Sequence, residues 1–513
     1  MSAEWFTQSR RLMSLSEKHA PADLLSSSEG RARDAAVDWL MGRINYEWVA
    51  DVPYNERQLK LDRMRQLLTR LGQPDAGMKI VHVAGTKGKG STSAMIAGML
   101  SAAGYRTGLF TSPHLELLEE RFAVDGLPCT AGELVALVDR VRPIVLTMDV
   151  EASIEGDTAG VPTFFEIVTA IALLHFVEHH VDAAILEVGL GGRLDSTNVC
   201  LPAVSVITSI SFDHTKLLGS TLAAIAREKA GIIKPGVPVV CGVTDAEPQQ
   251  VIAATAREHG CRLIQLGRDF AFQYGGIPAT AGELLAERGT SKTLDFGYHV
   301  PGQELELLAL PLAMFGRHQA ANAAVALAAI SELLRQGWRI STDAIREGLG
   351  RTVVPGRVEL LPGEPLVVLD VAHNPASAQA LVEALAELPA PTRRTLILSI
   401  SSDKDMPAIV ATLAPHFDRF VATQFRVNPR AVPADELAEI VRSQLASIND
   451  AGIVSGIAAA ADSSYSPPAV IVRTMPADAW AFASSSAIPG EVVCIAGSLF
   501  LAAELRPLVR ASK

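Results

Sequence analysis

The sequence predicts an α/β protein in which a P-loop-type domain with a mostly parallel sheet is followed by a smaller Rossmann-like α/β domain. Three observations predict this fold class. Short apolar runs alternate with helical patterns along most of the 513 residues, which is typical of parallel sheets covered by helices on both faces. A glycine-rich loop follows the apolar run from Met78 to Ala84 and precedes a helical pattern that ends near Gly104. The alternation restarts after Pro355 and Gly356, which break the preceding pattern.

The first domain is predicted to span residues 35–353, after a polar extension over residues 1–34. Apolar residues from Ala36 to Leu40 recur at helical spacing, and the segment from Leu59 to Leu71 carries one apolar helical face. After the loop we expect a strand at Thr107 to Thr111, a helix near Gly132 to Val141, a helix from Thr163 to His179, and strands at Ala183 to Val188 and Val204 to Thr208.

The end of the first domain is predicted to contain an irregular region from about Asp269 to Gly302 and a helix from Gln319 to about Leu334. The second domain is predicted over residues 354–513, and Ala451 to Pro468 within it is expected to be a lengthened loop. Its strands are expected at Leu366 to Val371, Thr395 to Ile400, Arg419 to Thr423, Val470 to Arg473 and Val492 to Gly497.

Composition and charge favour a globular protein with small-molecule partners. Apolar residues make up 49% of the chain, which is enough for two domain cores and excludes overall disorder. The net charge of -11 argues against nucleic acid or an anionic membrane as the main partner. No signal-peptide segment or bilayer-length apolar run is present, and the five cysteines form no C-x-x-C pair. We therefore expect a cytoplasmic protein.

The glycine-rich loop predicts a nucleoside triphosphate site. Its glycines let several backbone N–H groups point into one concavity, and the following helix adds the positive end of its dipole. Lys89 would bring a mobile charge to the outer phosphates, and the Ser91 hydroxyl is placed to bind magnesium. A flexible surface turn is the alternative, but two lysines in one such loop repel each other unless an anion is present. The expected nucleotide-binding residues of the loop are Gly85, Thr86, Lys87, Gly88, Lys89, Gly90 and Ser91.

Polar residues follow several predicted strands, and parallel sheets bind ligands beyond the carboxyl ends of their strands. Glu166 begins an otherwise apolar helix, and His214 follows a buried strand. A magnesium ion that bridges triphosphate oxygens is typically bound by a hydroxyl and a carboxylate as well, so Ser91 and Glu166 are candidate ligands. His214 is a candidate ligand for a second ion. The alternatives are an ordinary helix N-terminal charge for Glu166 and a hydrogen-bonded core histidine for His214.

Three further features have competing interpretations. By pattern alone, Lys229 is a surface cation near the C-terminus of a helix. Asp370 and His373 follow the first strand of the second domain and form either a site or a buried polar cap. Gly189 to Gly192 resembles a dinucleotide fingerprint, but the third glycine is replaced, so we expect no nicotinamide site.

Several segments together carry a family resemblance. They are Gly85 to Ser91, Thr111 to Leu115, Thr163 to Glu166, Gly189 to Asn198, Asp213 to His214, Arg227 to Ile232, Gly316 to Gln319 with Asn322, Pro355 to Arg357, and Asp370 to Pro375. In this order they resemble the motifs of folylpolyglutamate synthase and dihydrofolate synthase, which belong to the Mur ligase superfamily. The match runs from about Ala35 to Phe500. Lys87 departs from it, because many relatives carry asparagine there, and Ser401 to Asp405 is a variant of the family's usual segment.

The resemblance implies an ATP-dependent ligase. The γ-phosphate of ATP would pass to a substrate carboxylate, and L-glutamate would attack the resulting acyl phosphate to form an amide, with release of ADP and phosphate. Lys89, His214 and Lys229 would be the catalytic residues. Lys229 matches the lysine that is carbamylated in such enzymes, and its carbamate would support a second magnesium ion.

The resemblance also implies where the other substrates bind. Ser91 and Glu166 would hold the first of two magnesium ions. Asn322 would contact the adenine, while Arg357 and Asp370 would reach the triphosphate and the ribose from the second domain. The acceptor would be dihydropteroate or a reduced folate, and the protein is expected to be a monomer.

Two rival functions are retained. One is a ligase that acts on a cell-wall nucleotide peptide. The segments Thr163 to Glu166 and Thr111 to Leu115 favour a folate acceptor over this one. The other is a catalytically idle nucleotide- or folate-binding protein. The presence of the residues expected to act in catalysis counts against it.

Overall fold

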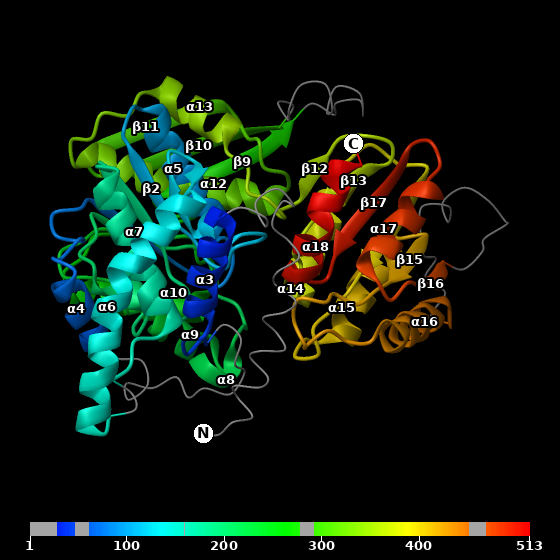
Figure 1. The fold of residues 1–513 in the computed structure, drawn as a ribbon. Helices are drawn as coiled ribbons and strands as arrows, with labels where there is room; N and C mark the ends of the chain where they lie inside the picture. Colours follow the sequence, from blue (N-terminus) through cyan, green and yellow to red (C-terminus); the bar gives the residue numbers. More distant parts are fainter. Residues whose placement is uncertain (1–27, 47–60, 158–159, 277–291, 451–467, 513) are drawn as a thin grey trace.

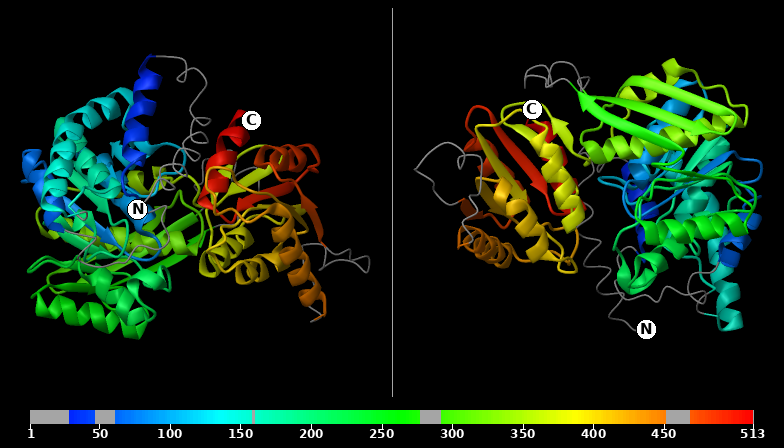
Figure 2. Two further views of the ribbon diagram at one scale, coloured as in Figure 1. Left: turned by 60° about the horizontal axis from the view of Figure 1, so that its bottom comes forward. Right: turned by 180° about the vertical axis from the view of Figure 1, so that it is seen from behind.

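The computed structural model describes residues 28–46, 61–157, 160–276, 292–450 and 468–512. Two α/β bodies lie side by side, and all the views show them as separate lobes (Figures 1 and 2). The elements before residue 352 form the first lobe, and those after residue 358 form the second. None of the described helices is long and apolar enough to cross a bilayer.

The first lobe is built on an eight-stranded sheet in the order β4-β3-β2-β5-β1-β6-β7-β8. Its central strands are parallel, so β2, β5, β1 and β6 end at the same edge. The strands are β1 (Ile80–Ala84), β2 (Thr107–Phe110), β3 (Phe122–Val124), β4 (Leu127–Pro128), β5 (Ala183–Glu187), β6 (Val204–Ile207), β7 (Val239–Cys241) and β8 (Leu263–Gln265). The register places Glu187 opposite Val83 on β1, directly before the glycine-rich loop.

Helices cover both faces of this sheet, as the apolar strand pattern predicts. Val81 and Val83 pack on one face with the helices α5 and α12, and Ile80 packs on the other with α6 and α7. The helices are α3 (Ser28–Met41), α4 (Leu61–Arg70), α5 (Lys89–Ala102), α6 (Ala131–Glu155), α7 (Phe164–Glu178), α8 (Thr215–Leu218), α9 (Leu222–Ala230), α10 (Ala246–Glu258), α12 (Arg317–Arg335) and α13 (Thr342–Arg351), with short 3₁₀ turns η1 (Leu118–Arg121) and η2 (Ser196–Val199).

The first helix begins earlier than the sequence predicts. Structure was expected from Ala35, but α3 starts at Ser28, so only residues 1–27 of the polar extension lie outside the described residues. Arg33 explains part of the difference, because its guanidinium bonds both carboxylate oxygens of Glu119. The Arg33–Glu119 ion pair therefore attaches the polar start of α3 to the first lobe, and the spacing of apolar residues cannot predict such a pair.

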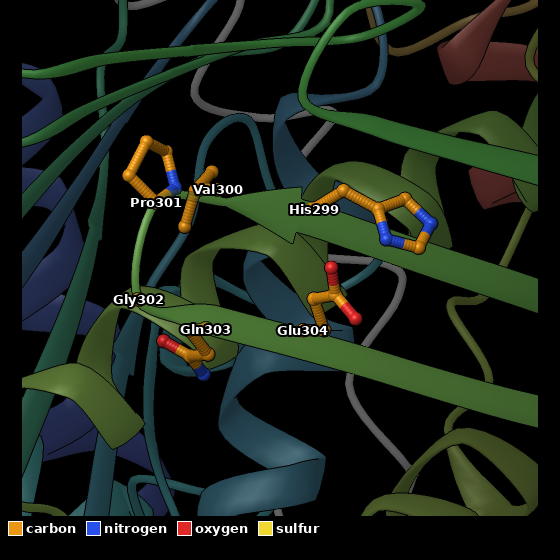
Figure 3. A pocket seen from close by; sticks show the side chains of 6 residues that line it. All are labelled: His299, Val300, Pro301, Gly302, Gln303 and Glu304. Atoms are coloured by element: carbon orange, nitrogen blue, oxygen red, sulfur yellow. The ribbon is translucent and has the colours of Figure 1, made fainter.

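The described parts of the region expected to be irregular, from about Asp269 to Gly302, form two strands that join a third just after it in an antiparallel sheet, so the prediction is wrong for these parts. The strands β9 (Phe270–Gly276), β10 (Lys292–Val300) and β11 (Gln303–Pro311) pair in the order β11-β10-β9. Alternate residues of β10, from Leu294 to Val300, are buried and pack with α12. A hollow of about 500 Å³ beside the β10–β11 turn is lined by the hairpin residues His299 to Glu304, none of which is a predicted site residue (Figure 3).

The second lobe contains the five predicted strands, and these predictions are confirmed. Its six-stranded sheet has the order β12-β13-β17-β14-β15-β16, and β12 alone is antiparallel to its neighbour. The elements are β12 (Glu359–Leu361), β13 (Leu366–Leu369), α14 (Pro375–Ala386), β14 (Arg393–Leu398), α15 (Met406–Leu413), η3 (Ala414–His416), β15 (Arg419–Ala422), α16 (Ala434–Asp450), β16 (Ala469–Val472), α17 (Pro476–Ser485), β17 (Glu491–Ala496) and α18 (Leu499–Ala511). The predicted loop falls on residues 451–467, outside the described residues.

Specific contacts join the two lobes beside the edge where β1 ends. Arg506 of α18 pairs with Glu116 of the first lobe and with Glu359 of the second. Tyr274 on β9 donates a hydrogen bond of 2.7 Å to Glu387, and α12 packs against α14. These contacts bring the start of the second lobe next to the glycine-rich loop.

Candidate active site

The glycine-rich loop links β1 to α5, as the sequence predicts. Gly88 is the N-cap of α5 and has a φ of 83°, a left-handed conformation that suits glycine. A Cβ atom there would lie 2.1 Å from Oδ1 of Asn322, so α12 leaves no space for a side chain. Ser91 is buried in the first turn of α5. The loop therefore has the shape of an anion site at a helix N-terminus.

The segment after β6 holds the loop in this shape. The Thr86 N–H donates to the Ser209 carbonyl at 2.7 Å, and the Lys87 N–H donates to the Ser209 hydroxyl at 3.0 Å. The Thr208 hydroxyl donates to the Lys87 carbonyl at 2.6 Å. Because neighbouring strands fix both ends of these bonds, the loop does not have to reorganise when an anion arrives.

Gly88→Ala should reduce nucleotide affinity at least about tenfold, roughly 1.4 kcal/mol, because the methyl group displaces Asn322 and the loop. Gly104→Ala is the matched control, since Gly104 has a φ of 88° but no atom within 4 Å of the added Cβ. Both variants should lose similar stability from backbone strain, about 1 kcal/mol. Thermal unfolding and titration with a fluorescent ATP analogue measure the two effects. Equal loss of affinity in both variants would contradict the steric argument.

Glu187 is a buried carboxylate that the fold places beside Lys89 of the loop. It ends β5, is 4% exposed, and has Oε1 4.0 Å from Lys89 Nζ. The Ser112 N–H, just after β2, donates to its Oε2 at 3.1 Å. Burial raises the pKa of Glu187, and Lys89 opposes that change. The sequence prediction missed Glu187. The available signal was a charged residue within the apolar run from Ala183 to Val188.

Glu166, which the sequence predicts as a magnesium ligand with Ser91, has its carboxylate engaged by Thr163 and Arg63. Its carboxylate caps α7, accepting bonds of 2.8 Å from both the N–H and the hydroxyl of Thr163. It also forms a buried ion pair with Arg63, with Nε 2.8 Å from Oε2. The Glu166 carboxylate is thus engaged at the start of α7, whereas the Glu187 carboxylate lies beside Lys89.

Lys229 is buried, so its interpretation as a surface cation is wrong. It is 5% exposed at the end of α9, and its Nζ donates to the Gly85 carbonyl at 2.8 Å. Burial and the charge of Lys89 lower the pKa of Lys229 to about 7. At neutral pH this side chain therefore has a large fraction of neutral, nucleophilic amine.

The segment after β6 brings Asp213 and His214 to the same edge. Lys87 Nζ lies 2.9 Å from Asp213 Oδ2, and this ion pair opposes the lowering of the Lys87 pKa by burial, Lys89 and Arg357. The His214 side chain is 52% exposed, so it is not a core histidine. Partial burial and neighbouring lysines lower the pKa of His214, which favours the neutral ring that binds metals.

The second lobe adds polar residues to this edge. Asp370 is buried and accepts bonds of 2.8 Å from the Val358 and Ala372 N–H groups, so it shapes the turn that carries Arg357. Burial raises the pKa of Asp370 to about 6. The His373 imidazole bonds the Val371 carbonyl at 2.8 Å, and burial and the charge of Lys87 across the interface lower its pKa to about 3.

The class of protein follows from two family models that match consecutive parts of the chain. The Mur ligase middle domain matches residues 83–330, which contain the loop, Glu187, His214 and Lys229. The glutamate ligase domain of Mur ligases matches residues 356–499, which contain Arg357 and Asp370. The fold is thus that of a Mur ligase.

Individual relatives narrow this class. A dihydrofolate synthase/folylpolyglutamate synthase of Bacillus subtilis is 36% identical over 87% of this chain and 94% of its own length. The structure of Mycobacterium tuberculosis folylpolyglutamate synthase complexed with ADP has a TM-score of 0.78 at 30% identity, covering 94% of this chain and 99% of that one. A Yersinia pestis bifunctional enzyme complexed with AMPPNP and a Mn ion has a TM-score of 0.70 at 30% identity, covering 93% and 98%. The chain belongs to the folylpolyglutamate synthase/dihydrofolate synthase family.

Proposed function

We propose that this protein is an ATP-dependent ligase that joins L-glutamate to the carboxylate of dihydropteroate or a reduced folate. Family membership supports the reaction class, and the observation that carries the proposal is the meeting of the phosphate loop, Glu187 and Lys229 at one sheet edge. An acceptor carboxylate oxygen attacks the γ-phosphorus, and the bond to the β,γ-bridging oxygen breaks as ADP leaves. The glutamate amine then attacks the acyl carbon, loses a proton, and displaces phosphate.

The phosphate-binding part of this proposal uses the loop residues Gly85 to Ser91. Backbone N–H groups at the start of α5 and the Lys89 ammonium would balance the charge that moves to the leaving ADP. Asn322, which abuts the loop at Gly88, would contact the adenine. Arg357 would reach the triphosphate from the second lobe, and Asp370 would reach the ribose or hold the turn that carries Arg357.

The donor atoms at this edge fit magnesium, a hard cation that prefers oxygen ligands. Within the described chain, Glu187 accepts one hydrogen bond, from Ser112, which leaves lone pairs free toward the loop. We propose that Ser91 and Glu187 hold one ion, and that His214 and carbamylated Lys229 hold a second. Magnesium would supply charge neutralisation for the transferred phosphoryl group. The carbamate would keep one N–H, which preserves the bond to Gly85.

The lobes at residues 35–353 and 354–513 are proposed to act as two domains that close on ATP, because Arg357 and His373 face the loop from the second lobe. We also propose that the enzyme is a cytoplasmic monomer. Its five cysteines are all free, in keeping with a reducing compartment.

The function is tested by measuring ADP release side by side with three acceptors: dihydropteroate, tetrahydrofolate and a nucleotide peptide. We expect release only when L-glutamate and at least one pterin acceptor are both present, with mass spectrometry showing one glutamate added per turnover. Turnover of the nucleotide peptide alone would identify the cell-wall alternative. Nucleotide binding without turnover of any acceptor would identify the idle binding protein.

A further inference from the structure

A second group of metal-binding side chains lies at the far end of α7 from Glu166. Cys129, Glu133 and His175 each place one ligand atom within 4.8 Å of the others. In the described parts of the chain, no other three His, Cys, Asp or Glu side chains come together in this way. None of the three belongs to the candidate active site, so this group has no function in the proposed ligase reaction.

The group is built where α6 begins and α7 ends, two helices that pack against each other (Figure 1). Cys129 precedes Thr130, the N-cap of α6, and Glu133 completes the capping box one turn later. His175 lies in the last turn of α7. Two separate helix ends therefore contribute ligands, and a bound ion would connect them.

His175 provides the second observation. It is 2% exposed, and its Nδ1 is fully enclosed without a hydrogen-bond partner among the described residues. Burying a polar nitrogen in this state is costly, and such atoms are rare in folded proteins.

His179 is oriented to support the group. Its ring centroid lies 4.4 Å from that of His175, and its Nε2 is 2.8 Å from Oε1 of Glu133. Arg106 approaches the other ring nitrogen, Nδ1, at 3.3 Å. Since Arg106 can only donate, His179 accepts at Nδ1 and donates from Nε2 to Glu133. A histidine that fixes a ligand carboxylate in this way is common around metal sites.

We propose that Cys129, Glu133 and His175 form a structural zinc site that connects the start of α6 to the end of α7. A sulfur, a nitrogen and a carboxylate oxygen suit zinc, whereas magnesium prefers oxygen alone. Water would complete the ligand set from the side where the Glu133 and His179 side chains are partly exposed. On binding, the Cys129 thiol releases its proton to solvent, so the thiolate and the Glu133 carboxylate together neutralise the two charges of the ion.

Metal binding to the full-length chain tests this proposal. The protein is freed of metal with a chelator and kept without nucleotide, and Co²⁺ alone is then added. We expect a thiolate-to-cobalt charge-transfer absorption, which oxygen ligands at the nucleotide site cannot produce. Zinc alone should then displace cobalt with one equivalent per chain and raise the melting temperature by roughly 5 °C.

Cys129→Ser should abolish the absorption band, while Cys200→Ser, which changes another buried cysteine of the same core cluster, should retain it. His175→Gln keeps the thiol and should weaken zinc binding at least about tenfold, so it serves as a second variant if Cys129→Ser does not fold. Absence of the band in the wild-type chain, a band that survives in Cys129→Ser, or equal zinc affinity in His175→Gln would overturn the proposal.

Discussion

Glu187→Gln is expected to reduce glutamate-dependent ADP release about a thousandfold, equivalent to roughly 4 kcal/mol of transition-state stabilisation. The reason is geometric. Glu187 is the buried carboxylate next to Lys89 and opposite the end of β1, so an amide there removes the charge that would hold a cation beside the phosphates. Glutamine keeps the shape and the hydrogen bond from Ser112, and the fold should survive.

Glu166→Gln is the matched control, because it makes the same chemical change in the other candidate carboxylate. It removes the anion of a buried ion pair with Arg63 and should cost about 3 kcal/mol of stability. Activity per folded molecule should stay within about tenfold of wild type. Steady-state assays over a range of magnesium concentrations, paired with denaturant unfolding, separate the two effects. If Glu166→Gln abolished turnover while Glu187→Gln remained active, Glu166 and not Glu187 would be the metal-binding carboxylate.

This pair of carboxylates shows where sequence reasoning succeeds and where it stops. The alternation of apolar runs predicts a mostly parallel sheet, which the structure confirms, and the strand-edge rule predicts polar site residues after β1, β5 and β6. It does not decide which carboxylate faces the loop. The position of Glu187 depends on the register between β1 and β5, which pairs Val83 with Glu187. The position of Glu166 depends on Arg63 of α4, which forms an ion pair with it although the two residues lie far apart in the sequence.

Long-range packing also explains the other differences. The alternation of Leu294, Phe296 and Tyr298 was visible in the sequence, but the partner surface that makes it a strand is α12, later in the chain. Lys229 has the spacing of an exposed helix residue, yet the end of α9 packs beneath the loop and buries it. Only the family resemblance indicated a special role for this lysine.

Lys229→Ala is expected to lose most of the ligase activity, about a hundredfold or more, and to regain part of it when bicarbonate or a short carboxylic acid is added. The alanine leaves a space beside the Gly85 carbonyl in which a small carboxylate can replace the proposed carbamate. Lys234→Ala is the control, since Lys234 also donates to a backbone carbonyl at 2.8 Å, but to that of Asn198 instead of one in the loop. Its activity should be nearly normal and insensitive to bicarbonate.

The lowered pKa of Lys229, about 7, gives this prediction a pH dependence with a definite sign. A carbamate forms by attack of a neutral amine on carbon dioxide with loss of one proton, so carbamylation should increase as pH rises through 7. In buffer free of carbon dioxide, the unfolded chain binds more protons than the folded chain between about pH 7 and the ordinary lysine value of 10.5. The charged, buried lysine therefore destabilises the fold below pH 7, and this penalty is relieved as the pH rises from about 7 to 10.5.

Lys229→Ala should flatten the rise in the free energy of unfolding over this pH range. Carbon NMR with labelled bicarbonate should show a carbamate signal in the wild type alone. An active, bicarbonate-insensitive alanine variant without these changes would show that the proposed carbamate of Lys229 is wrong.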